Sequence, residues 1–244
     1  MKKKLNLINA TAKILARQWG RTIPYFSRVE DTTFLDIQQF DWITDLESNW
    51  MKILKELNWL LNDLDAIPNF QEISKEQYPI TQDNLWKTYF FYAYGNKVQK
   101  NCERCPETTY LVERIPGMKT AFFSILLPHK HIPEHRGPYK GVLRYHLGLI
   151  VPQPKNSCRI RVGSDIAYWE EGKSLVFDDS YQHEVWNDSN GIRVVLFVDF
   201  VRPMYFPFSI INRFLIQLIS WSPLVRDGIK KQKQWNEYLE KLTS

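Results

Sequence analysis

Residues 131–152, HIPEHRGPYKGVLRYHLGLIVP, decide the fold because they combine strand-like alternation with a cluster of histidines. Histidine is the commonest metal ligand and titrates nearest neutral pH. Apolar and polar side chains alternate from Leu143 to Leu147, as in a strand with one buried face. The stretch therefore predicts a metal pocket built from β-strands. All five histidines of the 244-residue chain lie within residues 129–183: His129, His131, His135, His146 and His183.

Short strand-like segments surround this stretch on both sides. Clusters of Gly, Pro, Asn and Asp separate them, as expected of turns. Many short strands at this spacing predict a mainly β fold, a jelly roll whose two sheets enclose a ligand pocket. The expected strands are residues 86–94, 120–127, 141–151, 158–162, 166–172, 173–177, 183–187 and 191–200.

Helical periodicity is concentrated toward the two ends of the chain. An apolar stripe predicts a helix over residues 36–64, and a wide apolar face predicts helices after Pro203. We expect a single structural domain with an N-terminal helical extension (1–85), a β core (86–203) and C-terminal helices (204–244). Other expected elements are an amphipathic helix over 1–20, a loop over 21–32, an irregular segment over 68–83, a short helix over 106–114 and a charged helix over 227–242.

Composition excludes several classes of protein. The residues are 44% hydrophobic, enough for a core, and the net charge of +5 is spread out, without a nucleic-acid-binding motif. Three cysteines exclude a disulfide scaffold, and Cys102-x-x-Cys105, which lacks a second pair, is interpreted as a surface turn rather than a zinc site. No signal peptide or spanning segment is evident, so we expect a cytoplasmic protein. The terminal helices either dock on the core or contact an anionic membrane.

His135 and His183 form the strongest candidate ligand pair. They lie far apart in the sequence, so they have to come from different strands of one pocket. A non-haem Fe(II) oxygenase commonly uses two histidines and one carboxylate, which leaves positions open for co-substrate and oxygen. The usual carboxylate follows two residues after the first histidine, where this chain has Gly137. On spacing alone, the motif therefore lacks its carboxylate ligand.

Three segments together resemble the aspartyl/asparaginyl β-hydroxylase family, which is related to the bacterial lipid A acyl-chain hydroxylases. They are HRGPYKGVLRYHLGL, WEEGKSLVFDDSYQHEVW and RVVLFVDFVRP, and the similarity covers about residues 86–203. The resemblance implies a double-stranded β-helix, a cupin-like jelly roll, that uses Fe(II), the co-substrate 2-oxoglutarate and O2. It places the iron ligands on His135 and His183. The peptide-hydroxylating branch also has Gly at the position of Gly137, whereas the lipid A branch keeps Asp.

The resemblance also assigns co-substrate residues. The distal carboxylate of 2-oxoglutarate needs a buried cation, best met by the planar fork of an arginine. By resemblance Arg193 supplies it with help from Ser124, His146 contacts the carboxylate near the metal, and Trp86 forms an aromatic wall. Arg144 shares the strand face of His146. For His129 and His131 we expect loop or substrate-facing positions, and for Asp178 or Asp179 either a role in orienting a metal-bound water or a plain turn.

The implied reaction is hydroxylation of an unactivated C–H bond. One substrate hypothesis is an Asp or Asn residue of a peptide. The other is a lipid acyl chain or small amphiphile, because Val142 stands where the peptide branch has a second arginine. An alternative of another class is a non-catalytic jelly-roll binding module that has lost iron.

Overall fold

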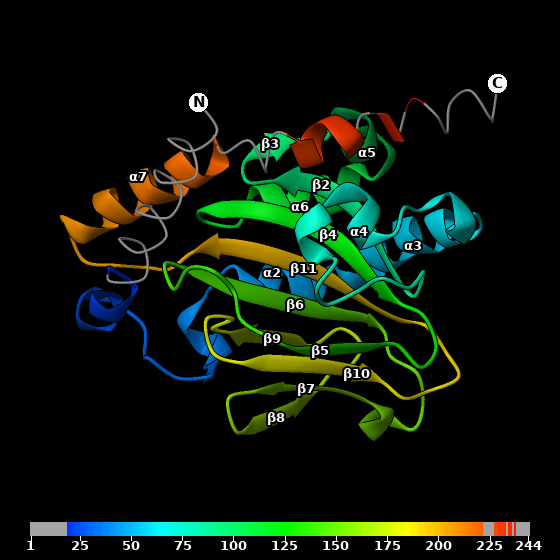
Figure 1. Cartoon of the computed structure of the whole chain (residues 1–244), viewed down its shortest axis with the longest axis horizontal. Helices are drawn as coiled ribbons and strands as arrows, with labels where there is room; N and C mark the ends of the chain where they lie inside the picture. Colours follow the sequence, from blue (N-terminus) through cyan, green and yellow to red (C-terminus); the bar gives the residue numbers. More distant parts are fainter. Residues whose placement is uncertain (1–18, 222–226, 233, 236, 238–244) are drawn as a thin grey trace.

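The computed structural model describes residues 19–221, 227–232, 234–235 and 237 (Figure 1). In this part of the chain the strands form a seven-stranded and a four-stranded antiparallel sheet. The larger sheet has the order β1 (Phe34–Leu35), β9 (Ser174–Phe177), β6 (Val142–Ile150), β11 (Arg193–Val201), β4 (Met118–Leu126), β2 (Trp86–Ala93) and β3 (Asn96–Lys97). The smaller sheet has the order β5 (His131–His135), β10 (His183–Asn187), β7 (Cys158–Val162) and β8 (Asp165–Tyr168).

The strand order is that of a double-stranded β-helix. From β4 to β11 the chain passes repeatedly between the sheets: β4, β6, β9 and β11 lie in the larger sheet and β5, β7, β8 and β10 in the smaller one. Two sheets joined in this way form a jelly roll. The expected fold class is confirmed, and β1, β2 and β3 widen the larger sheet.

Two apolar cores lie on opposite faces of the larger sheet. The inner core fills the space between the sheets, with Phe122 and Phe197 from one and Ile160 and Val185 from the other. The outer core packs the sheet against helices. These helices are α2 (Ile43–Ser48), α3 (Trp50–Leu61), α5 (Gln99–Arg104) and α6 (Pro106–Glu113).

Alternation along β6 explains how one strand serves both cores. Leu143, Tyr145 and Leu147 face the outer core, so Arg144 and His146 face the interior between the sheets. The pattern that predicted the strand therefore also points two polar side chains into the jelly roll.

The helical ends differ in detail from expectation. The helix expected over 36–64 is divided into η1 (Ile37–Gln39), α2, α3 and η2 (Leu64–Ala66). Residues 21–26, within the loop expected over 21–32, are helical. Phe26 of this segment stacks on Phe208 of α7 (Phe208–Ser220) with ring centroids 3.5 Å apart. The helix expected over 1–20 lies outside the described residues except for residues 19 and 20, whereas 227–232, 234–235 and 237 of the helix expected over 227–242 are described and are helical.

Two segments expected to be irregular contain short helices. α4 (Phe70–Ile73) begins with a capping box in which Asn69 and Glu72 bond each other's backbone, and η3 (Lys75–Gln77) follows it. The surface turn expected at Cys102 is wrong: both Cys102 and Cys105 are buried, on α5 and at its end. Unpaired cysteines act as small apolar residues, which explains their place in the core. The remaining short helix is η4 (Lys155–Ser157).

No helix among the described residues has the length and apolar character needed to cross a membrane.

Candidate active site

His135 and His183 lie directly opposite each other on neighbouring strands. His135 ends β5, His183 begins β10, and the two residues are register partners in the smaller sheet. Their ring centroids are 4.1 Å apart, with the planes inclined at 54°. The structure thus brings together the two side chains that the sequence predicted as ligands.

The hydrogen bonds of both imidazoles leave a metal-binding nitrogen free. His135 Nδ1 donates to the carbonyl of Pro133 at 2.8 Å, and His183 Nδ1 donates to that of Tyr181 at 3.0 Å. Because a carbonyl oxygen only accepts, Nδ1 carries the proton and Nε2 presents its lone pair.

Burial favours the neutral form of the same two rings. It lowers the pKa of His135, and it lowers the pKa of His183 to about 3, with further lowering from His135 and Arg144. Neutral imidazole is the form that binds a metal. The pair therefore fits a divalent cation such as Fe(II). Among the described residues, no group of three or more His, Cys, Asp or Glu side chains has metal-binding geometry.

The carboxylate of Asp179 occupies the space beside Gly137. A Cβ at Gly137 would lie well inside contact distance of both Asp179 carboxylate oxygens. The backbone also holds the two residues together, since Gly137 N donates to Asp179 O at 2.7 Å. Glycine is thus required here by the approach of a neighbouring acid, a reason that the sequence alone did not reveal.

Arg144 is already paired with two carboxylates. Its guanidinium lies 2.8 Å from Asp179 Oδ2 and 2.9 Å from Asp199 Oδ1, and it stacks over the Phe197 ring at 4.2 Å. Burial raises the pKa of Asp179 to about 7, although Arg144 opposes this shift. Asp199 was not among the residues predicted from the sequence, but counting alternate residues along β11 from Arg193 places it on the same inner face.

Arg193 points into the interior between the sheets. It is 2% exposed, and its guanidinium lies 4.6 Å from the centre of the Trp169 ring. Within the described residues its Nε has no hydrogen-bond partner, and its NH1 makes only a long 3.5 Å bond to Ser124 O. Burial lowers the pKa of Arg193 to about 10. A buried cation with unused donors is suited to binding an anion.

The other predicted co-substrate residues surround this arginine. Trp86 Nε1 donates to Ser124 Oγ at 3.1 Å. His146 is buried, and neither of its ring nitrogens has a partner among the described residues. Burial, then the charge of Arg193, lowers the pKa of His146 well below its usual value. Trp169, which the sequence analysis did not single out, stacks near His146 at 5.9 Å and also has an unpaired buried N–H.

His129 and His131 lie outside this interior. His129 is exposed, with a left-handed φ of 61°. His131 bonds Glu184 at 2.7 Å and stacks on Trp186 on the outer face of the smaller sheet. On a regular strand, residues four apart face the same side of the sheet. A register shift between β5 and β10 changes this alternation, so His131 and His135 face opposite sides.

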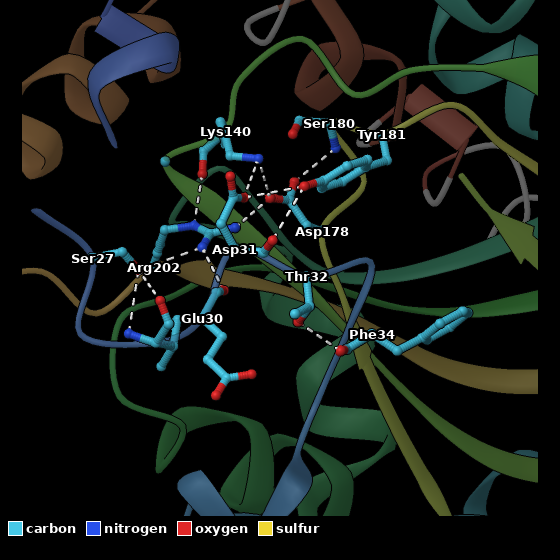
Figure 2. Close-up of polar contacts among 12 residues, drawn as sticks. Ser27, Glu30, Asp31, Thr32, Phe34, Lys140, Asp178, Ser180, Tyr181 and Arg202 are labelled. Atoms are coloured by element: carbon cyan, nitrogen blue, oxygen red, sulfur yellow. Dashed lines mark hydrogen bonds and ion pairs between the residues drawn. The ribbon is translucent and has the colours of Figure 1, made fainter. Parts of the chain in front are cut away.

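An ion-pair cluster with a buried centre holds the loops that carry the site (Figure 2). The Asp178 carboxylate accepts from Arg202, and both side chains are fully buried. It also pairs with Lys140 at 3.0 Å, and Lys140 in turn pairs with Asp31. The cluster of Asp31, Lys140, Asp178 and Arg202 joins the β5–β6 loop, the β9–β10 loop, the end of β11 and the segment before β1, and it thereby fixes Asp179 and the approach to His183.

The geometry defines a jelly-roll protein whose interior holds two adjacent imidazoles with free Nε2 atoms and a buried arginine that has no carboxylate partner among the described residues. A family model described as aspartyl/asparaginyl beta-hydroxylase matches residues 47–203. The chain belongs to this family of hydroxylases, as the sequence motifs indicated. The match begins well before the expected residue 86 and so includes α3 and the segment that follows it.

Individual relatives agree with the family assignment. An ornithine lipid ester-linked acyl 2-hydroxylase from Rhizobium tropici is 42% identical over 87% of this chain and 75% of its own length. The human aspartyl/asparaginyl beta-hydroxylase is 33% identical over 68% of this chain, which spans only 23% of the human protein. A cupin domain of a transcriptional regulator from Enterobacter cloacae, 11% identical, covers 48% of this chain and 96% of its own with a TM-score of 0.33. The fold assignment therefore rests on the strand order.

Proposed function

We propose that this protein is an Fe(II)- and 2-oxoglutarate-dependent dioxygenase that hydroxylates an acyl chain of a lipid. One observation carries the proposal: two imidazoles with free Nε2 atoms share an interior with a buried arginine whose Nε has no hydrogen-bond partner among the described residues.

His135 and His183 would hold the iron through Nε2. Bound iron, with O2, supplies the oxidation of a C–H bond coupled to conversion of 2-oxoglutarate to succinate and carbon dioxide. The role of the backbone carbonyls of Pro133 and Tyr181 is to fix the ring orientations and the tautomer before any metal arrives.

Arg193 would bind the distal carboxylate of 2-oxoglutarate. The Ser124 hydroxyl, held by Trp86, lies on the same inner surface and offers a further polar contact. The unpaired nitrogens of His146 suit the carboxylate nearer the metal. Trp169 closes the interior behind both side chains and keeps water out, which strengthens each charged contact.

Asp179 would take over part of the role of the absent carboxylate ligand. Its side chain fills the space over Gly137 but does not form a three-residue metal cluster with the histidines. From there a carboxylate can accept a hydrogen bond from water bound to the metal. Arg144 holds it in place.

An acyl substrate fits the interior better than an acidic peptide side chain. A substrate carboxylate needs a free cation, whereas Arg144 is already paired with Asp179 and Asp199 and position 142 is a valine. The Rhizobium relative, named for hydroxylation of an ester-linked acyl chain, supports the same choice.

The test is a turnover assay with defined substrates. Protein reconstituted with Fe(II) under anaerobic conditions is given 2-oxoglutarate, O2 and either a detergent-dispersed ester-linked lipid or an Asp-containing peptide. We expect succinate and a lipid product heavier by one oxygen, both lost in His183→Ala. Turnover of the peptide alone would reassign the substrate, and absence of both iron binding and succinate would favour a non-catalytic binding module.

A further inference from the structure

Helix α7 exposes apolar side chains on the face turned away from the protein. Its inner face is buried through Asn212, Ile216 and Ser220, spaced four residues apart. The outer face repeats at helical spacing as well, with Ile210 (59% exposed), Phe214 (58%), Leu218 (44%) and Trp221 (56%). A helix that only packs on a core carries polar residues on its outer face, so this face needs an apolar environment of its own.

Exposed aromatic residues lie at the start of the α7 face. Tyr205 and Phe206 precede the helix, and Tyr25 belongs to the neighbouring helical segment 19–26, with 59%, 78% and 82% exposure. The stacking of Phe26 on Phe208 and the 3.0 Å bond from Tyr205 N to Phe26 O hold the two segments together. Tyr and Trp, with an apolar ring and a polar tip, are typical of a membrane–water interface.

The charged residues of α7 and of segment 19–29 are all basic. Residues 19–29 contain Arg21 and Arg28, residues 205–221 contain Arg213, and neither range contains Asp or Glu. Arg21, Arg28 and Arg213 are exposed. A second copy of this chain would bring the same charge to the contact, whereas an anionic bilayer complements both the apolar face and its basic surroundings.

The inner face of α7 is tied to the loop that leads from the site. Asn212 Oδ1 accepts from the Tyr139 hydroxyl at 2.7 Å, and Asn212 Nδ2 donates to Gly141 O at 2.9 Å. Both partners lie in the β5–β6 loop, which begins immediately after His135. In Figure 1, α7 projects beyond the end of β11, beside the N-terminal helical segment and outside both sheets.

We propose that the α7 face, defined as Ile210, Phe214, Leu218 and Trp221, docks this protein on the surface of an anionic lipid bilayer. The inference deepens the proposed acyl hydroxylation by naming the surface from which the substrate is taken, and its biological purpose rests on that proposed function. Docking itself requires neither iron nor turnover.

The experiment is flotation of the full chain with vesicles of pure phosphatidylcholine and of an equimolar phosphatidylcholine–phosphatidylglycerol mixture. We expect wild type to bind the anionic vesicles, and I210D/F214D to lose about tenfold or more of that binding. The matched control is M51D/W59D, because Met51 and Trp59 are each 59% exposed on α3, and it should bind nearly as wild type does. R21Q/R213Q should weaken binding to the anionic vesicles.

Three outcomes overturn the docking proposal. They are failure of wild type to bind anionic vesicles, equal losses in I210D/F214D and M51D/W59D, and a solution dimer, seen by light scattering, that I210D/F214D converts to monomer. If circular dichroism shows I210D/F214D unfolded, F214S/L218S takes its place in the same comparison.

Succinate formation on detergent-dispersed lipid is measured separately. Turnover without vesicle binding overturns docking alone, and vesicle binding without turnover overturns only the proposed function.

Discussion

At the scale of single residues, Gly137 and Asp179 form one unit. The family pattern showed that Gly137 replaces a carboxylate, but only the folded chain shows that a neighbouring carboxylate fills the space this leaves. We therefore expect Gly137→Ala to destabilise the protein by about 1–3 kcal/mol, since overpacking a closed site forces its neighbours to shift. Thermal or urea unfolding measures the loss.

A double-mutant cycle tests the cause of that loss. If the added methyl group acts through Asp179, then G137A/D179A will be less destabilised than the two single changes predict together. Gly20→Ala is the control, because a Cβ there meets its nearest neighbour at an ordinary 3.9 Å. Additive effects of G137A and D179A would contradict this account.

A second residue-scale prediction concerns Asp83, which pairs with Lys130 in the loop before β5. The buried Lys130 ammonium donates to Asp83 at 2.9 and 3.0 Å and to Thr81 at 2.9 Å. Burial raises the pKa of Asp83, but hydrogen bonds from Lys130 and from Leu85 N–H outweigh it and hold the pKa below 3.8. Because the folded-state pKa is the lower one, this carboxylate stabilises the protein above pH 3.8, and the contribution is lost as the pH falls through the folded value.

Asp83→Asn should therefore be less stable than wild type at neutral pH, and the difference should shrink in acid. Urea unfolding at neutral pH and at about pH 3 compares the two proteins near the limits of this titration. Asp63→Asn, at an exposed carboxylate, serves as the control. A deficit in Asp83→Asn that persists unchanged in acid would rule out the pair as its source.

Where chemistry restricts the choice of side chain, the residues selected from the sequence are ones that the fold brings together. His135, His183 and Arg193 could be selected from the sequence because few other residues bind metals or bind carboxylates in a buried site. The orientation of His131 could not be predicted, because it depends on a register shift between β5 and β10. Trp169 could not be selected because nothing local distinguishes a tryptophan that contacts an arginine from one that fills a core.

At the scale of elements, the loops of the site depend on the Asp178 cluster more than on their own sequence. Removal of one partner from a buried ion pair leaves an uncompensated charge and costs about 3–5 kcal/mol. We expect a loss of this size in Arg202→Met, since Arg202 and Asp178 are both fully buried. Arg159→Met is the matched control: its pair with Asp188 lies at the surface and should contribute about 1 kcal/mol or less.

The readout for Arg202→Met includes the site as well as stability. Because Asp178 immediately precedes Asp179, loss of Arg202 should also weaken Co(II) binding, measured by the visible absorption of the bound ion. A variant that unfolds more easily but binds Co(II) as wild type does would confine Arg202 to a structural role.

Elements were predictable wherever one periodicity dominated. β6 and β7 followed from alternation, β11 from its nearly continuous apolar run, and α7 from its helical apolar spacing. β5 was not predicted as a strand, since it is short, contains Pro133 and is mostly polar. α5 was not predicted because its burial depends on contacts with β2 that no local sequence pattern encodes. One of these contacts is a bond from Cys102 Sγ to Phe91 O.

At the scale of the whole molecule, the jelly roll converts distance in sequence into proximity. Four strands from two sheets contribute His135, His146, His183 and Arg193 to one interior. The number of strands and their alternation favoured this topology, but the order β5-β10-β7-β8 is a property of the complete fold. That order makes β5 and β10 neighbours, which is the condition for a two-histidine site.

The same topology predicts separable effects of metal and co-substrate on unfolding. A ligand that binds only the folded state adds about 2.7 kcal/mol at roughly one hundred times its Kd, enough to raise the Tm of a protein of this size by about 5–10 °C. We expect Co(II) to stabilise wild type and Arg193→Lys alike, because both keep the histidine pair. Addition of 2-oxoglutarate should then raise the Tm of wild type further but that of Arg193→Lys much less, since lysine lacks the planar fork.

Arg161→Lys, on the outer face of the smaller sheet, should respond as wild type does. An equal 2-oxoglutarate shift in Arg193→Lys and Arg161→Lys would mean that the diacid binds elsewhere, whereas loss of the Co(II) shift in Arg193→Lys would mean that the arginine supports the metal site rather than the co-substrate.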